Sequence, residues 1–220
     1  MKNQTPKQQH KDFLKWRRQN KFLESLKSRE YLCQFESASD FLRQVFKDAD
    51  NEGWEGLQKG DLGEALFWAK SVVVDRLPVV HHHTNIPQEL KDRRKFSTDG
   101  KENGIDFVVV DQSNEECAVQ VKLYKKETLT KEDIDSFFSE ASNFDRRVVS
   151  TTTAKITNKI DESKYTAFKK HDWFLLSNEN WQKIVSFFNG DADSIKFKEW
   201  EYRDDQDDRF VPDCVSGLKN

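Results

Sequence analysis

The stretch that decides the fold is residues 103–123, NGIDFVVVDQSNEECAVQVKL. It contains two short apolar segments, 105–110 and 117–123, which are separated by the polar segment 111–116. Side chains alternate between the two faces of a strand, so this pattern predicts a β-hairpin with apolar faces. Three polar residues interrupt the apolar pattern at or within the strands: Asp106, Gln120 and Lys122.

These three polar residues are expected on one face of the hairpin. Gln120 and Lys122 are two positions apart and therefore share a face, and antiparallel pairing about the turn places Asp106 opposite one of them. Lysine and aspartate are rarely buried without a partner or a function. Two interpretations follow. The residues form a functional cluster, or Asp106 and Lys122 form a cross-strand ion pair.

The composition fits a folded domain that is polar but has enough core material. Charged residues make up 34% and the mean hydropathy is -0.88, while 17 Phe and 6 Trp provide apolar side chains. Cys33, Cys117 and Cys214 are far apart, fit no zinc spacing and suggest no disulfide framework. We therefore expect a reducing, intracellular compartment, cytoplasm or nucleus. No segment has the length and apolar character of a membrane span or signal peptide.

Charge is distributed unevenly along the chain and suggests three parts. Residues 1–30 hold nine Lys or Arg against three Asp or Glu, whereas residues 191–220 hold five against nine. We expect residues 1–50 to form a basic, helical N-terminal extension, residues 51–190 the main domain and residues 191–220 an acidic linker. A basic segment of this kind binds phosphate or is simply a solvated helix face.

Periodicity and capping residues predict helices and strands on both sides of the hairpin. Helices are expected over 8–31, 38–46, 61–75, 130–141 and 178–188, and strands over 78–84, 146–151 and 173–176. Residues 85–104 and 151–170 are polar. The former is expected to be a loop, and the latter has a weak helical pattern. The order of elements favours an α/β fold in which a mixed central β-sheet is flanked by helices. Glu64 falls in the first turn of the 61–75 helix, where the helix dipole favours a carboxylate.

Three consecutive histidines, His81, His82 and His83, lie in the expected strand 78–84. Consecutive residues of a strand face alternately, so the three imidazoles cannot easily bind one ion. The sequence therefore argues against a dedicated metal site at this run.

A carboxylate at Glu64, placed beside Asp106 and Gln120, would complete a set of oxygen ligands. Two carboxylates and an amide oxygen suit Mg²⁺, which prefers oxygen ligands. A bound metal ion can activate water and stabilise negative charge on a phosphate. Lys122 would then orient the attacking water, help to deprotonate it, or offset the developing charge.

The spacing of these residues resembles the PD-(D/E)XK nuclease superfamily, and in particular its Mrr-like branch, in which Gln replaces the middle acidic residue. The matching segments are GDLGEALFWAK with Glu64, NGIDFVVVD with Asp106, and CAVQVKLY with Gln120 and Lys122. TKEDIDSFFSEAS and FDRRVVSTT resemble the helix and strand that follow in the N-terminal nuclease domain of type ISP restriction–modification enzymes and related superfamily-2 helicase-nucleases. The resemblance covers residues 55–190.

This resemblance implies a restriction-endonuclease-like fold and a Mg²⁺-dependent DNA endonuclease domain at residues 51–190, with double-stranded DNA as partner. It implies that Asp106, Gln120, Glu64 and the backbone carbonyl of Val121 hold Mg²⁺, for which Mn²⁺ would substitute, and that Lys122 is the catalytic lysine. Six basic residues are candidates for contacts to the DNA backbone: Lys125, Lys126, Arg93, Arg94, Arg146 and Arg147.

The C-terminal residues carry a second resemblance. Residues 202–218 contain Arg203 and Gln206 in an Arg-x-x-Gln arrangement that is similar to the segment opening superfamily-2 helicase domains. This implies a helicase or translocase domain in cis beyond residue 220, and an acidic solvated tail is the alternative. For the nuclease itself, the alternatives are an inactive fold that binds DNA or a partner, and a stand-alone junction resolvase.

Overall fold

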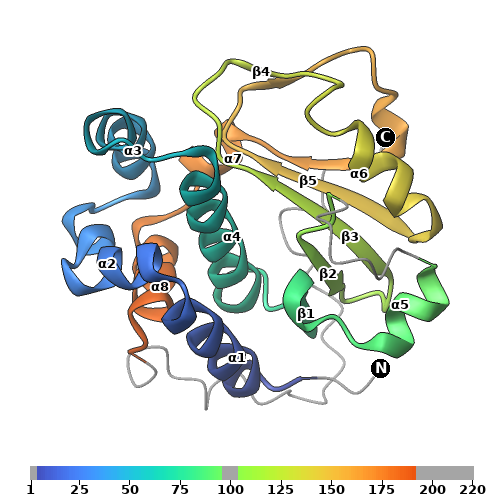
Figure 1. Ribbon diagram of the computed structural model, residues 1–220, viewed down its shortest axis with the longest axis horizontal. Helices are drawn as coiled ribbons and strands as arrows, with labels where there is room; N and C mark the ends of the chain where they lie inside the picture. The colour runs from blue at the N-terminus through green and yellow to red at the C-terminus, as the bar shows by residue number, and fades with distance from the viewer. Residues whose placement is uncertain (1–3, 96–103, 192–220) are drawn as a thin grey trace.

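The computed structural model describes residues 4–95 and 104–191 (Figure 1). The expectations for Arg203, Gln206 and the acidic linker therefore lie outside the described residues. Among the helices in these two ranges, none combines the length and apolar character needed to cross a membrane.

The described chain begins with four helices, α1 (Pro6–Gln19), α2 (Lys21–Ser28), α3 (Ala38–Glu52) and α4 (Gly56–Val73). The first two replace the single helix expected over 8–31. They are separate because Asn20 has extended backbone and its side chain accepts the N–H groups of Phe22 and Leu23, both at 3.1 Å. Helix α3 begins at residue 38 as predicted, and Ser37 caps it by accepting the N–H of Asp40 at 3.1 Å.

Helix α4 starts five residues earlier than the sequence indicated, at Gly56 instead of residue 61. Its start is held by Gln58, whose side-chain oxygen accepts the N–H of Glu55 at 2.8 Å. Glu64 therefore lies in the helix interior, about two turns from the start. The first-turn dipole interpretation of Glu64 is wrong, because the effect is confined to the terminal turn.

Five strands form a mixed sheet in the order β1-β2-β3-β5-β7. Strands β1 (Val79–His82), β2 (Phe107–Val110) and β3 (Glu116–Lys122) pair antiparallel, and the predicted hairpin is β2–β3. Strands β5 (Arg146–Thr151) and β7 (Thr166–Phe168) continue the sheet in parallel with β3. A separate short pair consists of β4 (Thr128–Leu129) and β6 (Lys155–Ile156).

The later helices are α5 (Gln88–Arg94), α6 (Asp135–Glu140), α7 (Lys170–Phe174) and α8 (Asn178–Asn189). Helix α5 lies inside the segment expected to be a loop, and α7 stands where a strand was predicted over 173–176. The strand prediction is wrong because the Asp172 side chain accepts the N–H of Lys169 at 2.6 Å and starts a helical turn. Short 3₁₀ turns complete the chain: η1 (Tyr31–Gln34), η2 (His83–Asn85), η3 (Ala141–Asn143) and η4 (Glu162–Lys164).

Helices cover both faces of the sheet, as the restriction-endonuclease-like prediction requires (Figure 1). Helices α1, α4 and α8 share one core with Phe107, Val119 and Val121. The α5–α6 side has its own core, which includes Val108 and Ala118. Because side chains alternate along a strand, Gln120 and Lys122 belong to the α5–α6 face together with Ala118. Helix α1 shares the core of α4, and the proposed boundary at residue 50 stays a prediction.

Gly63 allows α4 to lie directly on β3. A Cβ at this position would stand 3.1 Å from Leu123 Cβ and 3.3 Å from Val121 Cγ1. We expect Gly63→Val to push the helix away from the strand and to lower the free energy of unfolding by about 1–3 kcal/mol. Gly60→Val in the same helix is the control, since a Cβ there meets nothing within 4 Å. Urea unfolding followed by circular dichroism measures both, and equal losses would contradict the contact.

Candidate functional site

Three strand ends meet at one corner of the sheet. β1 ends at His82, which pairs with Phe107 at the start of β2, and Phe107 in turn pairs with Val119 near the end of β3. The residues just past these pairs are therefore neighbours in space. We call this place the corner site and define it by Glu64, His82, His83, Asp106, Gln120 and Lys122.

Asp106 links the ends of the three strands through hydrogen bonds. Its backbone N–H donates to the carbonyl of Val119 at 2.9 Å, and its own carbonyl accepts the N–H of His83 at 2.8 Å. Its carboxylate Oδ2 accepts the N–H of Val121 at 2.6 Å. The carboxylate thus lies against the strand segment that carries Gln120 and Lys122. The ion-pair interpretation of Asp106 and Lys122 is wrong, because within the described residues the Lys122 ammonium forms no ion pair.

Gln120 presents a buried acceptor at this corner. The residue is 2% exposed, and its Oε1 atom has no hydrogen-bond partner among the described residues. An unsatisfied buried polar atom costs about 1–3 kcal/mol, and a bound ion or water is one explanation for such an atom. An amide oxygen, a carboxylate and a nearby backbone carbonyl make an oxygen-donor set of the kind that Mg²⁺ prefers. The chemistry of these donors therefore suits a divalent cation, but among the described residues the Asp106 carboxylate is not part of the group of ligand atoms within 4.8 Å of one another that contains Glu64.

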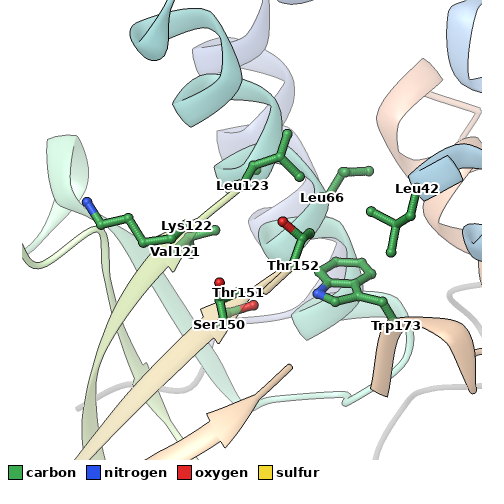
Figure 2. Close-up of a pocket in the computed structure, with 10 residues that line it drawn as sticks. Leu42, Leu66, Val121, Lys122, Leu123, Ser150, Thr151, Thr152 and Trp173 are labelled. Atoms are coloured by element: carbon green, nitrogen blue, oxygen red, sulfur yellow. The ribbon is translucent and has the colours of Figure 1, made fainter. Parts of the chain in front are cut away.

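Lys122 is half-buried, and its Nζ lies 6.0 Å from the centre of the Tyr124 ring. Figure 2 shows the Lys122 amine pointing away from Leu66, Leu42 and Trp173. A small cavity on that apolar side has room for only about one water molecule. A substrate phosphate would therefore have to approach Lys122 from the other side.

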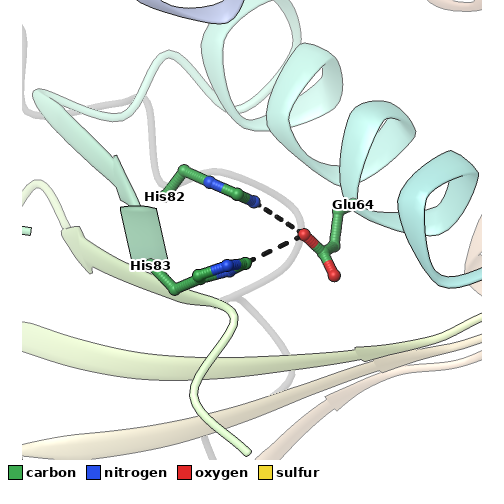
Figure 3. Close-up of side chains that lie close together, drawn as sticks. All are labelled: Glu64, His82 and His83. Atoms are coloured by element: carbon green, nitrogen blue, oxygen red, sulfur yellow. Dashed lines mark hydrogen bonds and ion pairs between the residues drawn. The ribbon is translucent and has the colours of Figure 1, made fainter. Parts of the chain in front are cut away.

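Glu64 reaches the corner site from α4, and two histidines hold its carboxylate (Figure 3). Glu64 Oε2 lies 2.6 Å from His82 Nε2 and 3.8 Å from His83 Nδ1. The His82 ring is fully buried and stacks on Trp68, with centroids 5.3 Å apart and an interplanar angle of 11°. Burial lowers the pKa of His82 to about 3, so its imidazole is neutral at physiological pH.

His82 and His83 converge although they are consecutive, which the alternation argument did not foresee. The strand ends at His82, and the 3₁₀ turn η2 begins at the next residue, so the alternation of side chains stops there. His81 does not join the group that Glu64 forms with the other two within the described residues. The consecutive histidines are visible in the sequence. Nothing in the sequence indicated that a turn follows His82 or that α4 brings Glu64 close to both imidazoles.

The predicted arginines lie at the opposite end of the sheet from Lys122. Arg146 stands beside Cys117 at the start of β3, and Lys122 is the last residue of that strand. Five residues of strand correspond to about 17 Å. Arg147 at the same end donates to the carbonyls of Ala141 at 3.0 Å and Ser142 at 3.2 Å. The fold therefore does not bring these two residues to the corner site.

Arg93 and Arg94 form a clasp at that far end with two acidic residues. Both guanidinium groups bind the carboxylate of Glu116, and the bond from Arg94 Nε is 2.6 Å long. Arg94 also binds Asp145 at 2.6 Å, and its hydrogen bond lowers the pKa of that carboxyl group. We call Arg93, Arg94, Glu116 and Asp145 the far-end clasp.

A groove of about 330 Å³ lies just past the end of β3, on the side of α3 and α4. Three lysines line it, namely Lys59, Lys125 and Lys126. Lys125 pairs with Asp50 at 2.6 Å and Lys126 pairs with Asp133, whereas Lys59 forms no ion pair within the described residues. Lys59 was missed from the sequence because the start of α4 was placed after it.

Comparison with curated proteins found no match to the chain. Among solved structures, the chain aligns with one described as "ATP-dependent Type ISP restriction-modification enzyme LlaBIII bound to DNA", with 19% identity and a TM-score of 0.41. The alignment covers 59% of this chain and 8% of that one, so the chain spans a small part of that enzyme. A family model described as restriction endonuclease matches residues 73–186, just over half of the chain, from the end of α4 into α8. The chain therefore belongs to the Mrr-like restriction endonuclease family of the PD-(D/E)XK superfamily.

Proposed function

We propose that this chain contains a Mg²⁺-dependent endonuclease domain that hydrolyses phosphodiester bonds of double-stranded DNA. One observation carries the proposal. The Asp106 carboxylate accepts the N–H of Val121 at 2.6 Å, and the preceding residue, Gln120, has a buried amide oxygen with no hydrogen-bond partner among the described residues. Membership of a restriction endonuclease family supports DNA as the substrate.

In this proposal Asp106, Gln120, Glu64 and the backbone carbonyl of Val121 hold the cation. A divalent cation bound there would supply positive charge that stabilises the negative charge developing on the scissile phosphate. The hydrogen bond between Glu64 and His82 restricts the Glu64 carboxylate to one orientation. A fixed carboxylate loses less conformational entropy when it binds a cation, which supports Glu64 as the ligand supplied by α4.

Lys122 is proposed as the catalytic lysine. Since no carboxylate within the described residues neutralises it, its ammonium group can direct its three N–H donors toward the substrate. It would orient the attacking water and offset the negative charge that develops on a non-bridging oxygen of the scissile phosphate. The Tyr124 ring beside it would limit the positions that the amine can take.

Contacts to the DNA backbone are proposed for the groove just past the end of β3, which a duplex that approaches Lys122 from the other face would reach around the end of that strand. Lys125 and Lys126 line this groove, and Lys59 joins them. Such contacts position a duplex and do not read its sequence. Four residues proposed from the sequence could reach only DNA that runs along the length of β3 to the far end of the sheet: Arg93, Arg94, Arg146 and Arg147.

The proposal includes a larger protein. We propose residues 51–190 as the nuclease domain, and a helicase or translocase domain in cis beyond residue 220. The second part rests on the resemblance of Arg203 and Gln206 to the opening segment of such domains.

Removal of the metal ion tests the proposal directly. The chain should convert supercoiled plasmid DNA to nicked or linear products in Mg²⁺, EDTA should stop the reaction, and excess Mg²⁺ or Mn²⁺ should restore it. The control is an Asp106→Asn preparation purified in parallel, which excludes a contaminating nuclease. Cleavage that persists in EDTA would contradict the metal requirement. DNA binding with no cleavage in either metal would instead favour the inactive, DNA-binding fold.

A further inference from the structure

We propose that Glu64, His82 and His83 bind a divalent cation through one carboxylate oxygen and two imidazole nitrogens, so that the corner site selects Mn²⁺, Co²⁺ or Zn²⁺ over Mg²⁺. One ligand atom from each residue lies within 4.8 Å of the other two (Figure 3). This adds nitrogen ligands to the cation binding already proposed for Glu64. Its test needs no DNA cleavage.

The distances between the three atoms are close to those that one ion requires. Zinc lies about 2.0–2.2 Å from nitrogen and oxygen ligands, which puts neighbouring ligand atoms about 3 Å apart. His82 Nε2 and Glu64 Oε2 are 2.6 Å apart, so binding would separate them by a few tenths of an ångström. His83 Nδ1 lies 3.8 Å from the same oxygen and would move slightly inward.

The surroundings of His82 match those of a metal-binding imidazole. Its Nδ1 lies 2.8 Å from the hydroxyl of Thr84. Nδ1 also accepts the N–H of Thr84 at 3.4 Å, so Nε2 carries the proton that it donates to Glu64. Binding of a cation at Nε2 would displace this proton and leave Nδ1 protonated. Nδ1 could then donate to the Thr84 hydroxyl, and a second hydrogen bond of this kind is the usual way a metal-bound histidine is oriented. The stack on Trp68 and the edge contact with Phe107, 5.1 Å between centroids, hold the ring in place.

Access and selectivity follow from the other two ligands. The His83 side chain is 36% exposed and that of Glu64 15%, so an ion can enter from the solvent side. Imidazole suits first-row transition ions, whereas Mg²⁺ prefers oxygen ligands in near-ideal octahedral geometry. The two histidines therefore favour a transition ion, while the oxygen atoms of Asp106 and Gln120 would bind Mg²⁺ and Mn²⁺ alike.

The test measures Mn²⁺ alone on the 220-residue chain without a histidine tag. The electron paramagnetic resonance signal of free Mn²⁺ gives the affinity, and competition gives the preference over Mg²⁺. Electron spin-echo modulation detects nitrogen bound directly to Mn²⁺. We expect one bound Mn²⁺ with a clear nitrogen modulation and a marked preference for Mn²⁺.

Single substitutions separate the ligands from the fold. His83→Asn should weaken Mn²⁺ binding at least about tenfold, reduce the nitrogen modulation and leave Mg²⁺ affinity nearly unchanged. Glu64→Gln should weaken both metals, because it removes the charge. The matched control is His171→Asn, at an exposed histidine of α7. Thermal unfolding checks each variant, and the exposure of the His83 ring makes its replacement compatible with folding.

Two results would overturn the proposal. One is Mn²⁺ that binds without nitrogen modulation, and the other is an unchanged preference for Mn²⁺ in His83→Asn. Either would mean that His82 and Glu64 form only a buried hydrogen bond that orients the carboxylate. If the wild-type chain fails to cleave DNA but keeps the nitrogen modulation, the nuclease proposal fails and the metal-ligand proposal stands.

Discussion

Asp106→Asn should abolish DNA cleavage and leave the fold in place. The amide oxygen of asparagine can still accept the N–H of Val121, which the carboxylate accepts at 2.6 Å, so the end of the hairpin keeps its hydrogen bond. The substitution removes the negative charge that the proposed cation needs. We expect the single-turnover rate to fall by at least about 10²–10³-fold, the range seen when one group that stabilises transition-state charge is removed.

The matched control for this prediction is Asp111→Asn. Asp111 follows the same strand at its other end, and its carboxylate likewise accepts backbone N–H groups, those of Ser113 at 2.8 Å and Glu115 at 3.0 Å. The charge change is identical, but the position is far from the corner site. Full cleavage is expected for this variant. If Asp106→Asn cleaves at the wild-type rate, the proposed cation site is refuted.

Lys122→Ala is expected to have the second large effect. Positioned groups that act on a proton or a water commonly contribute about 10²–10⁴-fold to the rate, so the loss should fall in that range. The effect on stability should be small, because within the described residues Lys122 forms no ion pair that the substitution would break. The measurement is the single-turnover rate at saturating DNA, with thermal unfolding alongside.

Lys125→Ala separates binding from chemistry. Lys125 lies three residues further along and pairs with Asp50 at the surface, a contact of the kind that contributes little to stability. This variant should bind DNA more weakly and yet cleave saturated DNA at nearly the wild-type rate. The assignment of Lys122 as catalytic would be untenable if the alanine variants at 122 and 125 showed the same rate at saturating DNA.

Much of the fold could be predicted because its signals are local. Residues 146–151 form the predicted strand, and α8 occupies the range predicted over 178–188, with Ser177 as its cap and Gly190 at its end. Elements without such signals were missed. The strand β7 lies in a polar segment, and its partner β5 is distant in the sequence. Helix α5 is short, and only Leu90 within it is buried, which gives no periodic pattern.

The candidate site was predictable to the extent that it depends on one hairpin. Alternation along the strand was enough to group Gln120 with Lys122, and the register then brings Asp106 to them. The convergence of His82 and His83 on Glu64 depends on where β1 ends and on how α4 crosses it, and neither can be inferred from spacing. The arginines were misplaced for a related reason, since the acidic partners Glu116 and Asp145 are 22 or more residues away from Arg94.

The two ends of the sheet differ in how well their polar groups are satisfied. The end with the far-end clasp favours stability, and the end with the corner site favours function. At the clasp, Arg94 forms ion pairs with both Asp145 and Glu116, so these charges are neutralised. At the corner site, Gln120 carries an unsatisfied buried oxygen and Lys122 has no ion partner within the described residues. Natural proteins commonly give up stability where they bind or react. Substitutions that remove the unsatisfied oxygen of Gln120 or the charge of Lys122 should therefore raise the melting temperature and lower activity. Substitutions in the far-end clasp should lower the melting temperature more than they lower activity.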